Sequence, residues 1–148
     1  MTVEAPSWSD PAVARRILTE FHVWAVVGAS PDPTRASHGV MRSLMRFGYD
    51  VIPIYPRRTI IHGLATLPDL PIAAAQRPAD SPIEVVDIFR ASHRAGAHVD
   101  EAIEIGARAV WLQLGVWDEA AAERAAAAGL LVVMDRCPAI DYPALLRS

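Results

Sequence analysis

Nearly continuous apolar runs alternate with amphipathic stretches along most of the chain. The runs are short, as expected for strands that are buried on both faces of a parallel sheet. Between them, apolar residues recur at helical spacing, and several of these segments end at a glycine, which is common just after a helix. The pattern predicts five strands, at Trp24–Gly28, Val51–Tyr55, Glu84–Phe89, Ala109–Leu114 and Leu130–Asp135.

Helices are expected between these strands. Asp10-Pro11 begins the first one, since an aspartate cap followed by proline is typical of a helix start. The segment 57–79 contains three prolines and is predicted to be irregular, with one short strand near Ile60–Ile61. The helices are predicted at about 10–21, before Gly48 (with Val40, Leu44 and Phe47 on one face), at about 97–105, at 118–128, and from about 139 as a short C-terminal helix.

Regular alternation of strand and helix, without repeats or a linker, indicates one α/β domain. We expect a Rossmann-like, doubly wound parallel sheet with helices on both faces. A single domain spans residues 1–148, with its core at about 23–137.

Composition narrows the classes of function. The net charge is -3 and no basic run exceeds two residues, which argues against a nucleic-acid partner. No apolar run reaches the length of a bilayer span, and the N-terminus MTVEAPSWSD has no leader-like pattern, so we expect a cytoplasmic protein without a membrane partner. A lone Cys137 and five unpaired histidines predict no metal site.

The turn after the first strand is the first candidate for ligand binding. In doubly wound sheets, ligands bind beyond the carboxyl ends of the strands, where the strand order reverses. A Rossmann-like order predicts a crevice between the first strand and Glu84–Phe89. Small residues there let a ligand approach the backbone, and the following helix N-terminus favours anions; alternatively, the glycine only permits a tight turn. The crevice would be lined by Gly28, Ala29, Ser30, Phe89 and Arg90.

Arginines at the strand ends suggest which ligand binds. Arg57 and Arg58 follow the second strand, where NAD-binding domains usually carry an acidic residue for the ribose hydroxyls. A guanidinium there can pair with a ribose-linked phosphate, and Arg35 and Arg90 add cationic donors to the same rim. Together they indicate a ligand with a pyrophosphate and a further phosphate, and both NADP and coenzyme A (CoA) fit.

Five segments resemble the small stand-alone CoA-binding proteins, which are related to the N-terminal CoA-binding domain of succinyl-CoA synthetase α subunits. They are VVGASPDPTRASHGV, GYDVIPIYP followed by IIHGLATLPDLP, VVDIFR, GARAVWLQLGV and AGLLVVMDRC. The resemblance implies CoA across the carboxyl edge of a Rossmann-like sheet, with no reaction assigned to the domain. Family members usually read V-N-P in the second segment, whereas this chain has Ile54, Tyr55 and Pro56, which affects the adenosine side.

Other polar residues near the strand ends have alternative interpretations. His38 begins the helix that faces the expected phosphate and either contacts the ligand or is a plain helix-start residue. Gln113 is a candidate for hydrogen bonding to a ligand amide. Cys137 is expected to be a buried structural cysteine, and Asp87 and Asp135 are expected to cap or accept hydrogen bonds rather than to catalyse.

Three hypotheses remain for the function. The first is a non-catalytic CoA or acyl-CoA binding protein, with no catalytic residues. The second is an NADP-dependent oxidoreductase-type domain, and the third is a regulatory subunit that docks on an acyl-CoA synthetase partner. A homo-oligomer is compatible with each of them.

Overall fold

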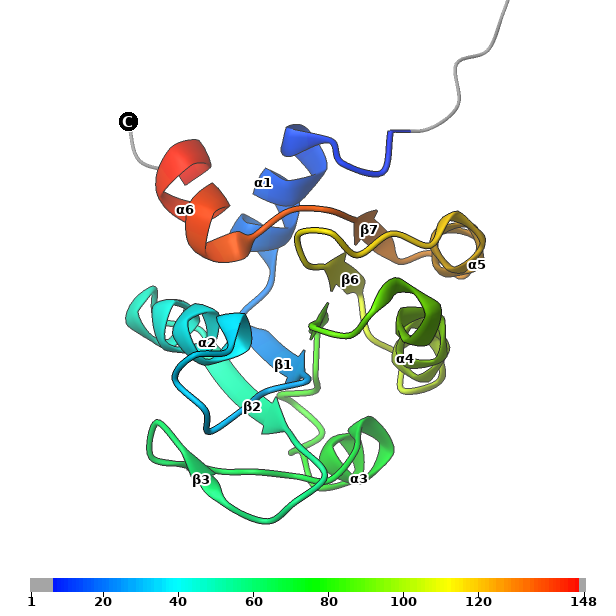
Figure 1. Ribbon diagram of the computed structural model, residues 1–148. Coiled ribbons are helices and arrows are strands. Elements are labelled where there is room, and N and C mark those ends of the chain that lie inside the picture. The colour runs from blue at the N-terminus through cyan, green and yellow to red at the C-terminus, as the bar shows by residue number, and fades with distance from the viewer. Residues whose placement is uncertain (1–6, 147–148) are drawn as a thin grey trace, which may run out of the picture.

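Five short strands form one sheet in the order β2-β1-β5-β6-β7, and every neighbouring pair is parallel (Figure 1). The computed structural model describes residues 7–146, so the two ends of the predicted domain, 1–6 and 147–148, lie outside the described residues. The predicted Rossmann-like parallel sheet is confirmed. The strands are β1 (Val23–Val27), β2 (Asp50–Ile54), β5 (Val85–Ile88), β6 (Ala109–Leu112) and β7 (Leu131–Val133).

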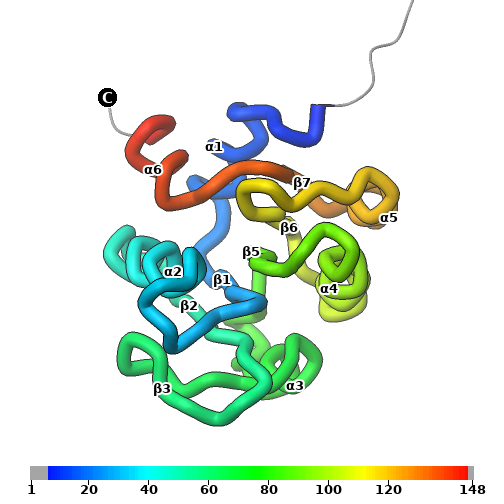
Figure 2. The backbone as a smooth tube through the Cα atoms, in the orientation of Figure 1, coloured from blue at the N-terminus to red at the C-terminus, as the bar shows by residue number. Residues whose placement is uncertain are grey.

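Helices cover both faces of this sheet, as the backbone tube shows (Figure 2). Trp24 and Trp111 are fully buried in the core under α1, α2 and α6. Val86 and Val110 belong to the other core, under α3, α4 and α5. The helices are α1 (Pro11–Glu20), α2 (Ala36–Arg46), α3 (Leu70–Ala75), α4 (Ser92–Glu104), α5 (Glu119–Ala127) and α6 (Pro138–Leu146).

The strand order reverses around β1. Val27, the last residue of β1, pairs with Ile54 of β2 on one side and with Ile88 of β5 on the other. The carboxyl ends of all three strands therefore finish at one edge of the sheet, and the predicted crevice between β1 and β5 lies at the point of reversal.

The segment 57–79 is more ordered than predicted. Asp69 caps α3 by accepting a hydrogen bond from the N–H of Ile72, and Pro71 lies in the first turn, where a missing N–H costs nothing. The expected strand at Ile60–Ile61 is present as β3, and it pairs antiparallel with β4 (Leu64–Ala65). One of the three prolines that suggested an irregular segment thus lies at the start of a helix.

The helix α4 begins at Ser92, five residues before the predicted start. Gly96 lies in the second turn of this helix. A Cβ at Gly96 would lie 2.8 Å from Oδ2 of Asp118, so the glycine permits close packing between α4 and the start of α5.

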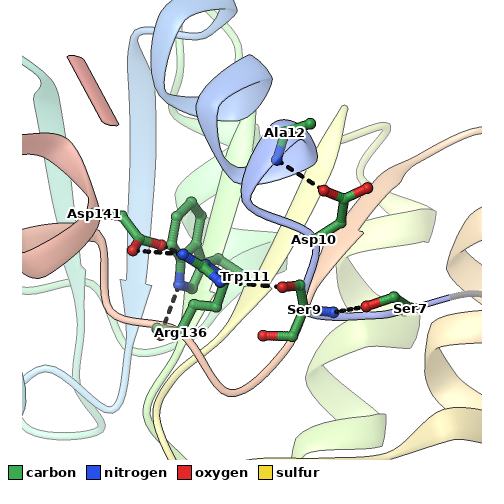
Figure 3. A network of polar contacts seen from close by, with 7 residues as sticks. All are labelled: Ser7, Ser9, Asp10, Ala12, Trp111, Arg136 and Asp141. Atoms are coloured by element: carbon green, nitrogen blue, oxygen red, sulfur yellow. Dashed lines mark hydrogen bonds and ion pairs between the residues drawn. The ribbon is translucent and has the colours of Figure 1, made fainter. Parts of the chain in front are cut away.

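A partly buried ion pair attaches the N-terminal segment to the sheet (Figure 3). The guanidinium of Arg136 contacts the Asp141 carboxylate through two bonds of 2.6 and 2.8 Å and donates to the carbonyl of Ser9 at 3.0 Å. The indole N–H of Trp111 donates to the carbonyl of Arg136 at 2.9 Å. One arginine therefore joins the start of α1, the sheet and α6.

Among residues 7–146, the structure contains no helix that is both long and apolar enough to cross a bilayer.

Candidate ligand-binding site

A pocket of about 710 Å³ opens at the carboxyl edge of the sheet. This volume lies within the range of small-molecule sites. It extends over the ends of β2, β1, β5 and β6, and neighbouring strands lie about 4.8 Å apart. Nine of the twelve predicted site residues line it: Gly28, Ala29, Ser30, Arg35, Tyr55, Pro56, Phe89, Arg90 and Gln113.

Gly28 sets the floor of the pocket. Its φ is +84°, and a Cβ at this position would overlap the backbone carbonyl oxygen of Phe89. The N–H of Phe89 donates to the carbonyl of Val27 at 2.8 Å, which holds the two strand ends together. The glycine is therefore required by close contact between two backbones, beyond the tight turn that it permits.

The loop after Gly28 is braced by its own side chains. Asp32 accepts hydrogen bonds from the N–H and the hydroxyl of Thr34, at 2.9 and 2.7 Å. These bonds, with the backbone bond contributing most, lower the pKa of the Asp32 carboxyl. Ser30 accepts from the N–H of Asp32 at 3.1 Å. The loop thus presents a preformed backbone surface to the pocket.

The N-terminus of α2 opens into the same pocket. Its cap residue is Arg35, which makes no side-chain capping bond, and the first-turn residues Ala36 and Ser37 line the pocket. An uncapped helix N-terminus offers N–H groups and a partial positive charge to an anion. A phosphate group fits this position chemically.

Two arginines and one amide of the lining have hydrogen-bonding groups that are not used within the described residues. Arg35 and Arg90 form none of the ion pairs found among the described residues. The Nε of Arg90 and the Oε1 of Gln113 are buried, and neither has a hydrogen-bond partner within residues 7–146. Buried polar atoms usually have partners, so these two residues of the pocket lining are candidates for contact with a ligand.

The end of β2 positions the other two predicted arginines. The hydroxyl of Thr66 donates to the carbonyl of Arg57 at 2.8 Å and accepts from the N–H of Thr59 at 2.9 Å. This buried threonine, which the sequence did not single out, holds the backbone beside Tyr55 and Pro56. Arg57 and Arg58 themselves are exposed and lie next to the pocket lining rather than within it.

His38 packs away from the pocket. Its ring lies 4.1 Å from that of His62, and Nε2 of His62 is 2.7 Å from the carbonyl oxygen of His38. Burial, followed by the charge of His62, lowers the pKa of His38. The structure therefore gives His38 a contact with the β3–β4 turn, which the sequence did not indicate.

Several lining residues were missed from the sequence. Leu114 and Val116 come from the loop after β6, and Ser37 is buried in the first turn of α2. The sequence did contain a signal for Ser37, since this residue lies in the first turn of the helix that follows a phosphate-type loop. Nothing in the local sequence distinguishes Leu114 from a core residue, although 54% of it is exposed.

The structure also tests what the sequence predicted for Asp135, Asp87 and Cys137. Asp135 accepts a hydrogen bond from the N–H of Gly115 at 2.8 Å, as predicted. The hydrogen-bonding role predicted for Asp87 is wrong: the residue is fully buried, and neither carboxyl oxygen has a partner among the described residues. Burial raises the pKa of Asp87 well above its ordinary value. Cys137 is a buried core residue that does not line the pocket.

Within the described chain, no group of three or more histidine, cysteine, aspartate or glutamate side chains is arranged to hold a metal ion. The site is instead a pocket with an uncapped helix end, two open cations and an open amide.

Comparison with known proteins adds independent information. The uncharacterized protein YneT of Bacillus subtilis (strain 168) is 32% identical over 126 residues, which cover 85% of this chain and 89% of YneT. A hypothetical protein from Pyrococcus horikoshii OT3 has a solved structure with a TM-score of 0.82 and 33% identity, covering 98% of this chain and 99% of that one.

A more distant likeness shows the same fold inside a larger enzyme. The Ca. Korarchaeum cryptofilum dinucleotide forming acetyl-coenzyme A synthetase 1, solved with phosphate and ADP, is 23% identical with a TM-score of 0.65. The match covers 78% of this chain and 26% of that one. The family model described as the CoA binding domain matches residues 22–143, which include every element from β1 to β7 and therefore the whole pocket. The chain belongs to this CoA-binding domain family.

Proposed function

We propose that this protein binds coenzyme A, free or as a thioester, in the pocket at the carboxyl edge of the sheet, and that it catalyses no reaction by itself. The observation that carries the proposal is the set of open donors in one pocket. Donor groups without an acceptor among the described residues are found at the uncapped N-terminus of α2, on Arg35 and on Arg90. Membership of the CoA-binding domain family supports CoA as the ligand that supplies it.

The chemistry of CoA matches this lining from one end to the other. Its pyrophosphate suits the α2 N-terminus and Arg35, because helix N–H groups and a guanidinium both stabilise phosphate oxygens. Arg57 and Arg58 adjoin the lining at the end of β2 and suit the phosphate on the ribose. The amide groups of the pantetheine arm suit Gln113, whose open Oε1 needs an N–H donor.

The groups that line the pocket support the proposed absence of catalysis. Among the described lining residues, Asp32 carries the only carboxylate, and its oxygen already accepts from Thr34. The chain contains no lysine, and its single cysteine is buried outside the pocket. The lining has hydroxyl groups on Ser30, Ser37 and Tyr55, but the described lining includes no histidine to activate them as nucleophiles on a thioester.

Calorimetric titration with CoA, dephospho-CoA, NADP and NAD tests the proposal. We expect CoA to bind most tightly and NAD to bind least, since no acidic residue follows β2 to hold its ribose hydroxyls. Changing Arg35→Ala should weaken CoA by about 10- to 100-fold, as one charge-assisted bond is lost. The matched control Arg15→Ala, on an exposed position of α1, should leave binding unchanged.

Tighter binding of NADP than of CoA would instead support the oxidoreductase-type hypothesis. Hydrolysis of acyl-CoA that tracks the protein through purification would contradict the absence of catalysis.

A further inference from the structure

The pocket changes in character from β1 to β6. The β1 side carries the charged residues Asp32 and Arg35, and Arg90 follows β5. The β6 side contributes Gln113, Leu114 and Val116, none of which is charged. With the strands about 4.8 Å apart, one elongated ligand would cross from a cationic end to a neutral and apolar end.

The loop after β6 exposes large apolar side chains at this neutral end. Leu114 is 54% exposed and Trp117, three residues further along, is 41% exposed. Single exposed apolar residues are ordinary on a protein surface. Here Leu114 and Trp117 share one loop, and Leu114 also lines the candidate pocket. Exposed apolar residues that gather at a pocket are typical of a ligand-binding surface.

The exposure is built into the loop by specific hydrogen bonds. The N–H of Val116 donates to the carbonyl of Gln113 at 2.9 Å, and Val116 itself is buried. Asp135 accepts from the N–H of Gly115 at 2.8 Å, and the hydroxyl of Ser92 accepts from the N–H of Trp117 at 3.0 Å. The anchored backbone therefore fixes the loop that carries the exposed side chains, which reduces the cost of ordering it when a ligand binds.

Two lining residues that follow neighbouring strands each carry a polar atom without a hydrogen-bond partner among the described residues. Arg90 follows β5 and offers an N–H donor, and Gln113 follows the neighbouring β6 and offers a carbonyl acceptor. A secondary amide has one carbonyl and one N–H, so it can satisfy both atoms. The pantetheine arm of CoA carries amides between its phosphates and its sulfur, which directs the sulfur end toward the apolar loop.

We propose that the loop Gln113–Trp117 is a subsite for an aliphatic acyl group, so that the preferred ligand is an acyl-CoA thioester rather than free CoA. This inference rests on the proposed binding of CoA and adds the class of acyl group. The thioester carbonyl follows the pantetheine arm past Gln113, and the aliphatic chain covers Leu114. Burial of that side chain by the ligand supplies the selectivity.

The test is a calorimetric series with CoA, acetyl-CoA, butyryl-CoA and hexanoyl-CoA. Since a fully buried methylene contributes about fourfold in affinity and this subsite is open on one side, we expect about two- to fourfold for each added methylene. Leu114→Asn, a polar change on an exposed position, should reduce the ratio of hexanoyl-CoA to CoA affinity to about one. The control Ile140→Asn, an exposed apolar residue on α6 outside the pocket, should keep the wild-type ratio.

The outcomes separate this inference from the proposed function. If CoA binds but the thioesters bind no more tightly, the acyl subsite is refuted and CoA binding stands. A chain-length gain that survives in the Leu114→Asn variant also refutes the subsite. If neither CoA nor any thioester binds, the proposed function fails, and the subsite with it.

Discussion

Replacing the buried Asp87 by asparagine should alter how stability depends on pH. Asp87 lies in the middle of β5, fully buried, between Val26 of β1 and Trp111 of β6. Desolvation is the cause of its raised pKa, and no partner among the described residues offsets it. In the folded protein the carboxyl therefore keeps its proton well above the pH at which the unfolded chain releases it, at about 3.9.

The sign and size follow from proton linkage. Below about pH 4 both states bind the proton, and the stabilising contribution of the protonated Asp87 is fully present. As the pH rises from there toward the folded pKa, only the unfolded chain loses its proton, so the free energy of unfolding falls by about 1.4 kcal/mol per pH unit. Asparagine has a similar shape and does not titrate. The stability difference between the wild type and Asp87→Asn should thus shift toward the variant by about 1.4 kcal/mol for each pH unit between about pH 4 and the folded pKa.

Urea unfolding at pH 4.5, 5.5, 6.5 and 7.5 measures this difference, with fluorescence of the buried Trp24 and Trp111 as the signal. The control Asp80→Asn changes an exposed aspartate on the loop before β5 and should give a nearly constant difference. If the Asp87→Asn and wild-type curves run parallel across this range, the carboxyl is ionised in the folded protein and the reasoning is wrong.

Three other predictions concern the pocket. Gly28→Ala should lower the free energy of unfolding in urea by about 3 kcal/mol or more, since it adds a backbone clash to a positive φ. The control Gly129→Ala has a similar φ and open space around it, and should cost about 1 kcal/mol. Equal losses would show that the close contact is not the cause. Changing Arg57 and Arg58 together to alanine should weaken CoA about tenfold or more while sparing dephospho-CoA, as measured by calorimetry, and equal losses would mark them as ordinary surface charge. Cys137→Ser should lower the melting temperature, because it buries a hydroxyl in the core, but keep the affinity for CoA within a few-fold; a loss above tenfold would make the thiol part of the site.

The strands could be predicted because parallel strands that are buried on both faces have nearly continuous apolar sequences. Once their order was assumed, Gly28 and Phe89 followed as neighbours, since the carboxyl ends of adjacent parallel strands share one edge. Much of the pocket lining could also be predicted from the residues of the turns, because small residues and arginines cluster where the strands end.

What sequence could not supply depends on tertiary contacts. The helix α3 is an exception, because its signal is local: Asp69 caps it and Pro71 lies in its first turn, much as Asp10 and Pro11 begin α1. Asp87 looked like a hydrogen-bonding residue because the partners of a buried carboxyl are set by chain segments far away. Leu114 looked buried because local hydropathy does not record which side of a loop faces solvent.

The cluster around Arg136 has a kinetic consequence. Arg136 and Ser9 are 127 residues apart in sequence, so their contact closes a long loop and we expect it to form late in folding. Interactions that form late are largely absent from the transition state for folding, and their removal accelerates unfolding more than it slows folding. We therefore expect the Arg136 contacts to slow unfolding of the native protein. The step that they slow is the release of α1 from the sheet.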